Sequence, residues 1–318
     1  MRGITVSLSE VVKDFPYDLH VLYGDRLLSR KRLNSPDLNR PGLLLAGFTR
    51  EFSRERIQIL GLTERAYLLH TLHRKGRKGT LKVLEILFSR RVPAVILTSG
   101  DRKLPSRLLT AILEMAEKYR TPVLSTTLKT PRFMALMSDR LFYLLAPRET
   151  LHGVMVEIHG VGVLITGKPG IGKSETALEL IRRGHRFVAD DMVMVKRYPP
   201  NSLLAEPPSA REDMTFFIHI RGIGTIYVPH YFGVSAIRRS YPLHIVVALS
   251  EEERPVEKTE ILGIPLPKYS VKVHPLKATA TVVESMALHY KANVLKDIIR
   301  LPDFAKLLED RLKRTPKG

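Results

Sequence analysis

The segment that most restricts what this chain can fold into is GKPGIGKS, at residues 167–174. A β-branched, apolar run at residues 161–166 precedes it, and apolar residues at helical spacing follow it over residues 175–183. A strand, a glycine-rich loop and a helix in this order are the context of a P-loop, where backbone N–H groups and the helix N-terminus bind phosphate oxygens. The segment therefore predicts an α/β domain that binds a nucleotide or a polyphosphate.

The residues of this loop have separate predicted parts in ligand binding. Lys173 would reach the β- and γ-phosphates, and the hydroxyl of Ser174 would bind Mg²⁺. The backbone around the phosphates would come from Gly167, Lys168, Pro169, Gly170, Ile171 and Gly172. The loop does not indicate which group accepts the phosphoryl group.

The length of the chain, 318 residues, predicts two domains at about 100–200 residues each. Strands and helices alternate in the first part: a strand at 92–98, a helix at 104–119, a short strand at 121–124 and a helix at 132–145. This alternation predicts a small α/β domain with a mostly parallel sheet, over residues 1–142. Residues 143–318 would form the second α/β domain, which contains the P-loop.

The formal net charge of +19 favours polyanionic partners in general. The densest basic run, at residues 74–78, has no interleaved aromatic residues and no helix-turn-helix or zinc-finger spacing, so we interpret it as a solvated loop and expect no nucleic-acid partner. The absence of cysteine excludes disulfides and thiolate zinc sites. No segment approaches the ~20 apolar residues of a membrane span, so we expect no membrane partner and a cytoplasmic protein.

Two carboxylates, Asp190 and Asp191, follow an apolar run that reads as the next strand. Carboxylates at a strand end beside a P-loop commonly hold Mg²⁺, and one can accept a proton from an attacking hydroxyl. We favour this interpretation over a pair of turn aspartates. His152, just before the strands that lead to the loop, is by the residues alone either a turn residue or a catalytic group.

A second glycine-containing motif is IHIRGIGTIYV, at residues 218–228. Gly222 and Gly224 permit a tight turn, and Arg221 could bind a phosphate through two hydrogen bonds. An ordinary turn is the alternative.

Several segments together resemble the bacterial HPr kinase/phosphorylase family: LAPRETLHGVMVEIHGVGVLITG, the P-loop, SETALELIRRGHRFVADD, IRGIGTIYV and LPKYSVKV. With Arg40-Pro41-Gly42 and SRERIQILG, the resemblance covers nearly the whole chain. It implies a small N-terminal α/β domain and a P-loop kinase domain of the HPr kinase type. It also implies ATP or pyrophosphate as donor, Mg²⁺ or Mn²⁺ as metal, and a serine of the phosphocarrier HPr as acceptor. The reverse phosphorolysis, a homohexamer and a role in regulating carbon metabolism are implied as well.

The resemblance also implies roles for single residues. Lys173 corresponds to the phosphate-binding lysine, Ser174 to a Mg²⁺ ligand, Asp191 to the general base and acid, and His152 to the active-site histidine. Arg221, Gly222 and Gly224 correspond to a segment linked to the kinase reaction. Arg254 is the best placement for a further active-site arginine, and a helix at residues 302–313 would serve docking or assembly. Asp190 completes the expected metal site.

This sequence also departs from the family pattern. His219 stands where the family usually has a metal-binding glutamate, and imidazole is a poor ligand for Mg²⁺. The metal preference could therefore move towards Mn²⁺, or Asp190 could compensate. In the loop, Lys168 replaces a common acidic residue, and Pro169 removes one backbone N–H.

A further departure is Val273-His274-Pro275-Leu276, where the family has an arginine before Pro-Gly. Because a fixed cation for inorganic phosphate is lost, we expect the kinase reaction to be retained better than the phosphorolysis. Two alternatives stay open: a catalytically weak, nucleotide-binding regulatory protein, and a kinase of another serine or of a small molecule.

Overall fold

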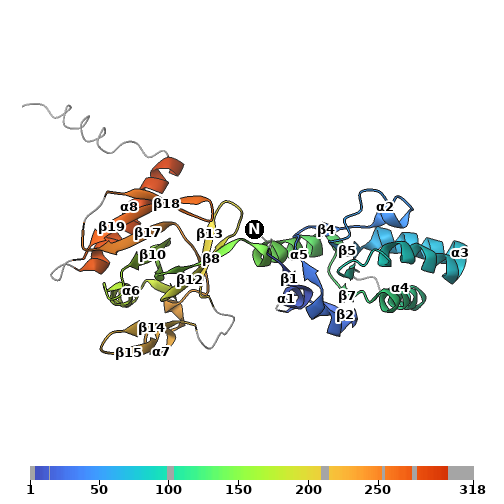
Figure 1. Cartoon of the computed structure of the whole chain (residues 1–318), viewed down its shortest axis with the longest axis horizontal. Helices are drawn as coiled ribbons and strands as arrows, with labels where there is room; N and C mark the ends of the chain where they lie inside the picture. Colours follow the sequence, from blue (N-terminus) through green and yellow to red (C-terminus); the bar gives the residue numbers. More distant parts are fainter. Residues whose placement is uncertain are drawn as a thin grey trace, which may run out of the picture. The chain divides into compact units, whose positions relative to one another are not determined.

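The computed structural model describes residues 4–13, 15–98, 104–208, 215–252, 255–273 and 278–299 (Figure 1). The chain divides into two compact units, Met1–Ala146 and Pro147–Gly318. The boundary expected from the sequence, between residues 142 and 143, falls inside the last helix of the first unit, Thr130–Leu145. Among the described residues, no helix is long and apolar enough to cross a membrane.

The N-terminal unit is built on a five-stranded sheet with the order β2-β7-β6-β5-β4. Strands β4 to β7 run parallel to their neighbours and β2 is antiparallel to β7, so the predicted, mostly parallel sheet is confirmed. The elements are β1 (Val6–Ser7), α1 (Leu8–Val12), β2 (His20–Tyr23), η1 (Asp25–Arg30), β3 (Arg32–Leu33), β4 (Leu38–Asn39), α2 (Gly42–Leu45), β5 (Ile57–Leu60), α3 (Leu62–Phe88), β6 (Val95–Thr98), α4 (Ser106–Tyr119), β7 (Val123–Thr126) and α5 (Thr130–Leu145).

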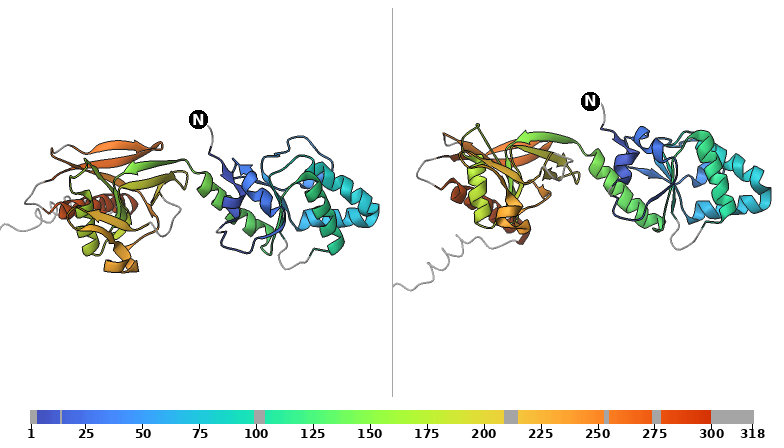
Figure 2. Two further views of the ribbon diagram at one scale, coloured as in Figure 1. Left: turned by 60° about the horizontal axis from the view of Figure 1, so that its bottom comes forward. Right: turned by 90° about the horizontal axis from the view of Figure 1, so that it is seen from below.

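Helices cover both faces of this sheet, as Figure 2 shows. Alternate residues of a strand point to opposite faces, so Val95 and Leu97 of β6 pack with α3 and α4. Ile96, between them, packs with α1 and α5. The central strand β6 is therefore buried on both faces and is apolar over its first three residues.

The basic run at residues 74–78 was wrongly interpreted as a loop. It lies within α3 and is exposed, and the helix is kinked at Gly76, whose φ is 62° and ψ −171°. Leu68 before the kink and Leu84 after it are both fully buried in the same core. Packing on either side thus holds two helical segments that meet at Gly76, within a polar stretch whose local pattern favours a loop.

The C-terminal unit contains a six-stranded sheet, order β11-β9-β10-β17-β19-β18, and a four-stranded sheet, order β16-β13-β12-β8. In the larger sheet the pairs β10–β17 and β17–β19 are parallel, and the other neighbours are antiparallel. The elements are β8 (Arg148–His152), β9 (Val154–Ile158), β10 (Val161–Gly167), α6 (Lys173–Arg182), β11 (Arg186–Ala189), β12 (Met192–Arg197), β13 (Leu203–Glu206), β14 (Phe217–Ile220), β15 (Gly224–Tyr227), α7 (Val228–Phe232), η3 (Val234–Ala236), β16 (Tyr241–Pro242), β17 (Ile245–Ser250), β18 (Glu257–Ile261), β19 (Ile264–Lys272) and α8 (Thr279–Ile299).

Strand β10 lies inside the larger sheet and is buried on both faces. Val163 and Ile165 pack with α6, α8 and the β14–β15 hairpin. Leu164 points the other way and packs with residues of β12 and β13 in the smaller sheet. The predicted strand and helix around the P-loop are confirmed as β10 and α6. The loop is thus attached to a buried strand that is paired on both sides within the sheet.

Candidate phosphate and metal site

The P-loop connects the end of β10, at Gly167, to the start of α6, at Lys173. Its glycines have backbone conformations that other residues rarely adopt: φ is 147° at Gly167, 80° at Gly170 and 100° at Gly172. A Cβ atom on Gly167 would also lie 2.7 Å from the carbonyl oxygen of Leu249. The predicted sharp turn before a helix N-terminus is therefore present, with no room for a side chain where it begins.

The side chain of Lys173 lies over this turn. Its Nζ atom donates hydrogen bonds to the carbonyl oxygens of Gly167 and Lys168, at 3.1 and 3.3 Å. The ammonium group is thus held above the backbone that would surround a phosphate chain. This is the place from which it can contact phosphate oxygens.

Ser174 and Asp190 meet at the start of α6. The Ser174 hydroxyl donates to both carboxylate oxygens of Asp190, at 3.2 and 3.3 Å. The backbone N–H of His219 donates to Oδ2 of Asp190 at 3.2 Å. Burial raises the pKa of Asp190, and the hydrogen bonds from His219 and Ser174 offset this only in part.

This pair of residues fits a bound Mg²⁺ ion. Mg²⁺ prefers oxygen ligands and is commonly held by one or two carboxylates together with phosphate oxygens and water. Among the described residues, no lysine or arginine forms an ion pair with Asp190. A half-buried carboxylate without a cationic partner, in contact with the P-loop serine, is a suitable ligand for a divalent cation.

Asp191 and His152 lie beside each other at the ends of two paired strands. The register of β8 and β12 places His152 opposite Met192, and the N–H of Gly153 donates to the carbonyl oxygen of Asp191 at 3.1 Å. Asp191 has a positive φ of 65°, and both side chains are exposed. The two adjacent aspartates therefore differ: Asp190 faces the P-loop serine, and Asp191 is open to solvent.

The β14–β15 hairpin brings Arg221 to the loop. The guanidinium nitrogens of Arg221 lie 3.7 and 3.8 Å from the position that a Cβ atom of Gly170 would occupy. Gly222 and Gly224 have φ of 81° and 103°, which the tight turn requires. A positive charge thus lies beside the phosphate-binding backbone.

His219, on β14 of this hairpin, contacts the metal site only through its backbone N–H. Its Nδ1 atom is 3.2 Å from the hydroxyl of Thr225, the residue opposite it on β15. Sequence reasoning identified His219 but not Thr225. The available signal was the register of the hairpin. Once two paired strands are assumed on either side of the turn, Thr225 lies opposite His219.

A pocket of about 270 Å³ that the sequence did not predict adjoins the loop. Its lining includes Gly167, Lys168, Ile171, Ser250, Glu251, Glu252, Lys268 and Ser270. It lies where the carboxyl ends of three neighbouring parallel strands, β10, β17 and β19, meet, which is a common place for a ligand in α/β sheets. Arg254, residues 274–276 and the helix expected at 302–313 lie outside the described residues.

The chain matches two described protein families along most of its length. "HPr Serine kinase N terminus" matches residues 6–141, and "HPr Serine kinase C-terminal domain" matches residues 143–300. The chain belongs to the HPr serine kinase family. The resemblance and the two-domain α/β architecture inferred from the sequence are thereby confirmed.

Relatives within the HPr serine kinase family match over nearly the whole chain. The HPr kinase/phosphorylase of Prosthecochloris aestuarii is 37% identical over 294 residues, which cover 90% of this chain and 82% of that protein. The one from Caldicellulosiruptor bescii is 36% identical over 296 residues, with 90% of each chain covered. The one from Lactiplantibacillus plantarum is 33% identical over 323 residues, covering 98% of this chain and 96% of that protein.

Among solved structures, the HPr(Ser) kinase/phosphatase from Coxiella burnetii is similar to part of this family member. It is 33% identical, with a TM-score of 0.43, and the match covers 46% of this chain and 92% of that one. With a TM-score this low, the family assignment rests on the two domain matches and the full-length relatives.

Proposed function

We propose that this protein is a protein serine kinase that transfers a phosphoryl group from ATP, with pyrophosphate as an alternative donor, to a serine of HPr. The observation that carries the proposal is the pair of adjacent aspartates with different surroundings. Asp190 contacts the P-loop serine, and Asp191 is exposed beside His152. A metal ligand and a proton acceptor next to each other are what phosphoryl transfer to a hydroxyl requires.

The residues of the loop would bind the donor. Lys173 and the loop N–H groups contact the phosphates, and Arg221 approaches them from the β14–β15 hairpin. Mg²⁺ held by Ser174 and Asp190 would neutralise charge on the β- and γ-phosphates, and Mn²⁺ is the alternative ion. The pocket between Lys168 and β19 offers space for the rest of the nucleotide.

Asp191 would act on the acceptor. It takes the proton of the serine hydroxyl as the oxygen attacks the γ-phosphorus, and ADP leaves. In the reverse direction inorganic phosphate attacks phosphoserine, the bond between phosphorus and the serine oxygen breaks, and Asp191 returns the proton to that oxygen, which gives serine and pyrophosphate. His152, at the neighbouring strand end, would help to position the acceptor or the phosphate.

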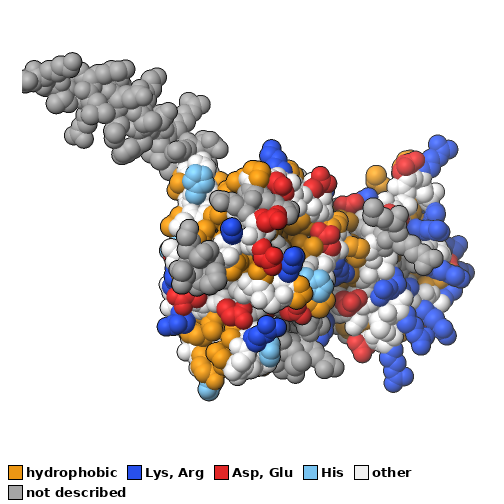
Figure 3. Space-filling view, turned by 60° about the vertical axis from the view of Figure 1, so that its left-hand side comes forward, with side chains coloured by type: hydrophobic (Ala, Val, Ile, Leu, Met, Phe, Trp, Pro, Cys, Tyr) orange, Lys and Arg blue, Asp and Glu red, His pale blue; other side chains and the backbone are white. Residues whose placement is uncertain are grey.

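The surface beside the loop favours a protein acceptor over a small molecule. Ile223 at the hairpin tip, Tyr231 on α7 and Val234 after it are 71%, 67% and 79% exposed. Phe217 and Tyr227 face each other across the hairpin, with ring centroids 4.9 Å apart and planes tilted by 39°. Figure 3 shows hydrophobic side chains gathered at the lower edge of the C-terminal unit, where these elements lie. Exposed apolar patches of this kind commonly mark protein interaction sites.

The relatives' names support HPr as the acceptor protein, and they support phosphorolysis of phosphoserine as the reverse activity. A homohexamer and a role in regulating carbon metabolism rest on the family resemblance alone, and a cytoplasmic location is the expectation from the sequence.

The decisive experiment is transfer of label from γ-labelled ATP, with Mg²⁺ or Mn²⁺, to HPr from the same organism. We expect Asp191→Asn to keep ATP binding and to lower the rate about 100- to 10,000-fold, because a general base contributes that much. Asparagine tolerates the positive φ at this position, so the fold should persist. Asp25→Asn, the same change at an exposed residue of the N-terminal unit, should leave the rate unchanged.

HPr with its acceptor serine replaced by alanine should take up no label. Tight ATP binding by the wild-type protein without transfer to HPr would refute the proposal and favour a regulatory, nucleotide-binding protein. Transfer to another protein's serine, but not to HPr, would support the serine kinase reaction and refute HPr as the acceptor.

A further inference from the structure

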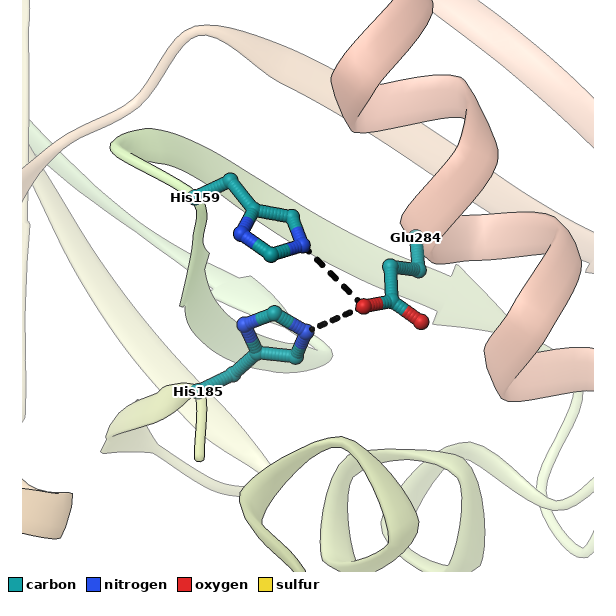
Figure 4. Close-up of side chains that lie close together, drawn as sticks. All are labelled: His159, His185 and Glu284. Atoms are coloured by element: carbon teal, nitrogen blue, oxygen red, sulfur yellow. Dashed lines mark hydrogen bonds and ion pairs between the residues drawn. The ribbon is translucent and has the colours of Figure 1, made fainter. Parts of the chain in front are cut away.

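Three side chains outside the phosphate site converge on one point in the C-terminal unit (Figure 4). His159 lies in the turn between β9 and β10, His185 lies just beyond α6, and Glu284 lies on α8. The Nε2 atoms of His159 and His185 are 3.1 and 3.0 Å from Oε1 of Glu284. One ligand atom from each residue lies within 4.8 Å of the others.

We propose that these three residues, the His159 site, bind a divalent transition-metal ion, with Zn²⁺ as the expected ion. Two imidazole nitrogens and one carboxylate oxygen are donors that Zn²⁺ and Co²⁺ accept, whereas Mg²⁺ prefers oxygen alone. Bonds of about 2.0–2.1 Å to a tetrahedral ion hold its ligand atoms about 3.3 Å apart. The observed separations from Oε1 are close to this, and the three ligand atoms all lie within 4.8 Å of one another, so the remaining adjustment is in the spacing of the two rings.

The two rings are already aimed at a common point. Their centroids are 4.6 Å apart and their planes are nearly perpendicular, at 85°. In Figure 4 both rings turn an Nε2 atom towards the carboxylate. Without a metal, both Nε2 atoms would have to donate a proton to the same oxygen. With a metal, both Nε2 atoms instead offer lone pairs to the ion between them. The competing explanation for this arrangement is a cluster held by hydrogen bonds alone.

The second carboxylate oxygen of Glu284 is fixed from the other side. Arg183 donates to it at 3.0 Å, and also to the hydroxyl of Thr281 at 2.9 Å and to Glu179 at 3.1 Å. Contacts of this kind orient a ligand and leave its other oxygen free for a metal. Burial raises the pKa of Glu284, but the hydrogen bonds from His185, Arg183 and His159 outweigh it and hold the pKa below its ordinary value.

Two positive charges next to the site oppose a cation. One is Arg183, whose charge is shared with Glu179, and the other is the ammonium of Lys291, which donates to the carbonyl oxygen of His159 at 2.6 Å. We therefore expect weaker binding than at a zinc site built from thiolates.

The exposure of the three side chains suits an ion that enters from solvent. His185 is buried, with 5% of its side chain exposed, Glu284 is 22% exposed and His159 is 41% exposed. The open side, at His159, leaves room for water as the fourth ligand. A bound ion would join the β9–β10 turn, the end of α6 and α8, and so stabilise the packing of α8 on the sheet that carries the P-loop.

The proposal is tested by His159→Asn. This residue is exposed, and its φ of 51° is a conformation that asparagine tolerates, so the change removes the imidazole and keeps the turn. His185 is too deeply buried to serve, because its loss would disturb folding. His230→Asn, which removes an exposed imidazole on α7, is the matched control.

The measurement is titration of the metal-stripped full chain with Co²⁺, followed by its visible absorption, and with Zn²⁺ by calorimetry, both in excess Mg²⁺ to occupy the oxygen site. We expect one ion with nitrogen ligands in the wild type and in His230→Asn, and binding at least about tenfold weaker in His159→Asn. In EDTA, His230→Asn should melt with the wild type, and His159→Asn should melt only slightly lower, because it loses one exposed hydrogen bond to Glu284. Equal affinity and stoichiometry in His159→Asn, or no Zn²⁺ binding by the wild type, would overturn the proposal.

Discussion

At the scale of single residues, Asp190 is the carboxylate whose environment demands a cation. It is half-buried, it accepts hydrogen bonds from Ser174 and His219, and burial raises its pKa. Asp190→Asn keeps an acceptor oxygen for both donors and removes the charge. We expect the variant to fold but to lose its stabilisation by Mg²⁺, which for the wild type amounts to about 2.7 kcal/mol when the ion is at 100 times its Kd.

Thermal unfolding with and without Mg²⁺ measures this effect. The wild-type melting temperature should rise with the ion, and that of Asp190→Asn should not. An equal rise in both proteins would place the ion elsewhere and contradict the metal site formed by Ser174 and Asp190.

Residues that are close in sequence were predicted better than those that meet only in the fold. Lys173 and Ser174 were assigned from a local pattern of strand, loop and helix, and the structure contains that pattern, with Lys173 over the loop and Ser174 against Asp190. Their parts in phosphate and metal binding stay predictions. The contact of Arg221 with Gly170, and the cluster of His159, His185 and Glu284, depend on how the hairpin and α8 pack on α6. No local periodicity carries that information, because the packing is set by the whole core.

At the scale of elements, the pairing of β9 with β11 brings together an ion pair whose carboxylate is buried. Arg186 lies opposite Glu157 and its Nη1 is 2.6 Å from Oε2 of Glu157, whose side chain is only 5% exposed. Burial raises the pKa of Glu157, but the hydrogen bonds from Arg186 and from the N–H of Gly160 outweigh it, so the pKa lies below its ordinary value.

We expect Arg186→Met to lower the free energy of unfolding by about 2 kcal/mol at pH 7, because Glu157 is left buried with one donor fewer. The folded protein favours the ionised form of Glu157 more than the unfolded chain does. The stabilisation that the ion pair gives the wild type is therefore complete above the ordinary pKa of about 4.3. It is lost as the pH falls through the lowered pKa, so the gap between the two proteins should narrow below about pH 4.

Denaturant unfolding at several pH values measures this gap. Arg182→Met is the control, because Arg182 pairs with Glu179 on the exposed face of α6 and should cost less than about 0.5 kcal/mol. A cost for Arg186→Met that is no larger than the control's, or one that grows at low pH, would show that the pair does not stabilise the fold.

The elements also show why one part of the fold was misread. The P-loop strand was predictable because residues 161–165 of β10 are buried and contain no polar side chain. Helix α3 was not, because residues 74–78 are charged, contain Gly76 and are exposed, while the burial that keeps the helix together lies on either side of them.

At the scale of the whole molecule, every described residue of the candidate site belongs to the C-terminal unit, and each unit has its own core. The buried clusters of residues 147–299 contain no residue of the N-terminal unit, and the N-terminal clusters contain none of the C-terminal unit. A chain that begins at Pro147 keeps β8, and with it His152 at the edge of the smaller sheet. We therefore expect residues 147–318 alone to fold cooperatively and to bind ATP within about threefold of the full chain's Kd, since the loop and its supports are complete.

A chain that begins at Val154 is the matched control for this fragment. It lacks His152 and the strand that covers β12, so β12 would become an open sheet edge with unpaired backbone groups. We expect this shorter fragment to be less stable and more prone to aggregate than the one from Pro147. Calorimetric unfolding and ATP titration compare the two. A Pro147 fragment that unfolds without a cooperative transition, or that binds ATP more than tenfold more weakly than the full chain, would show that the phosphate site needs the N-terminal unit for its support.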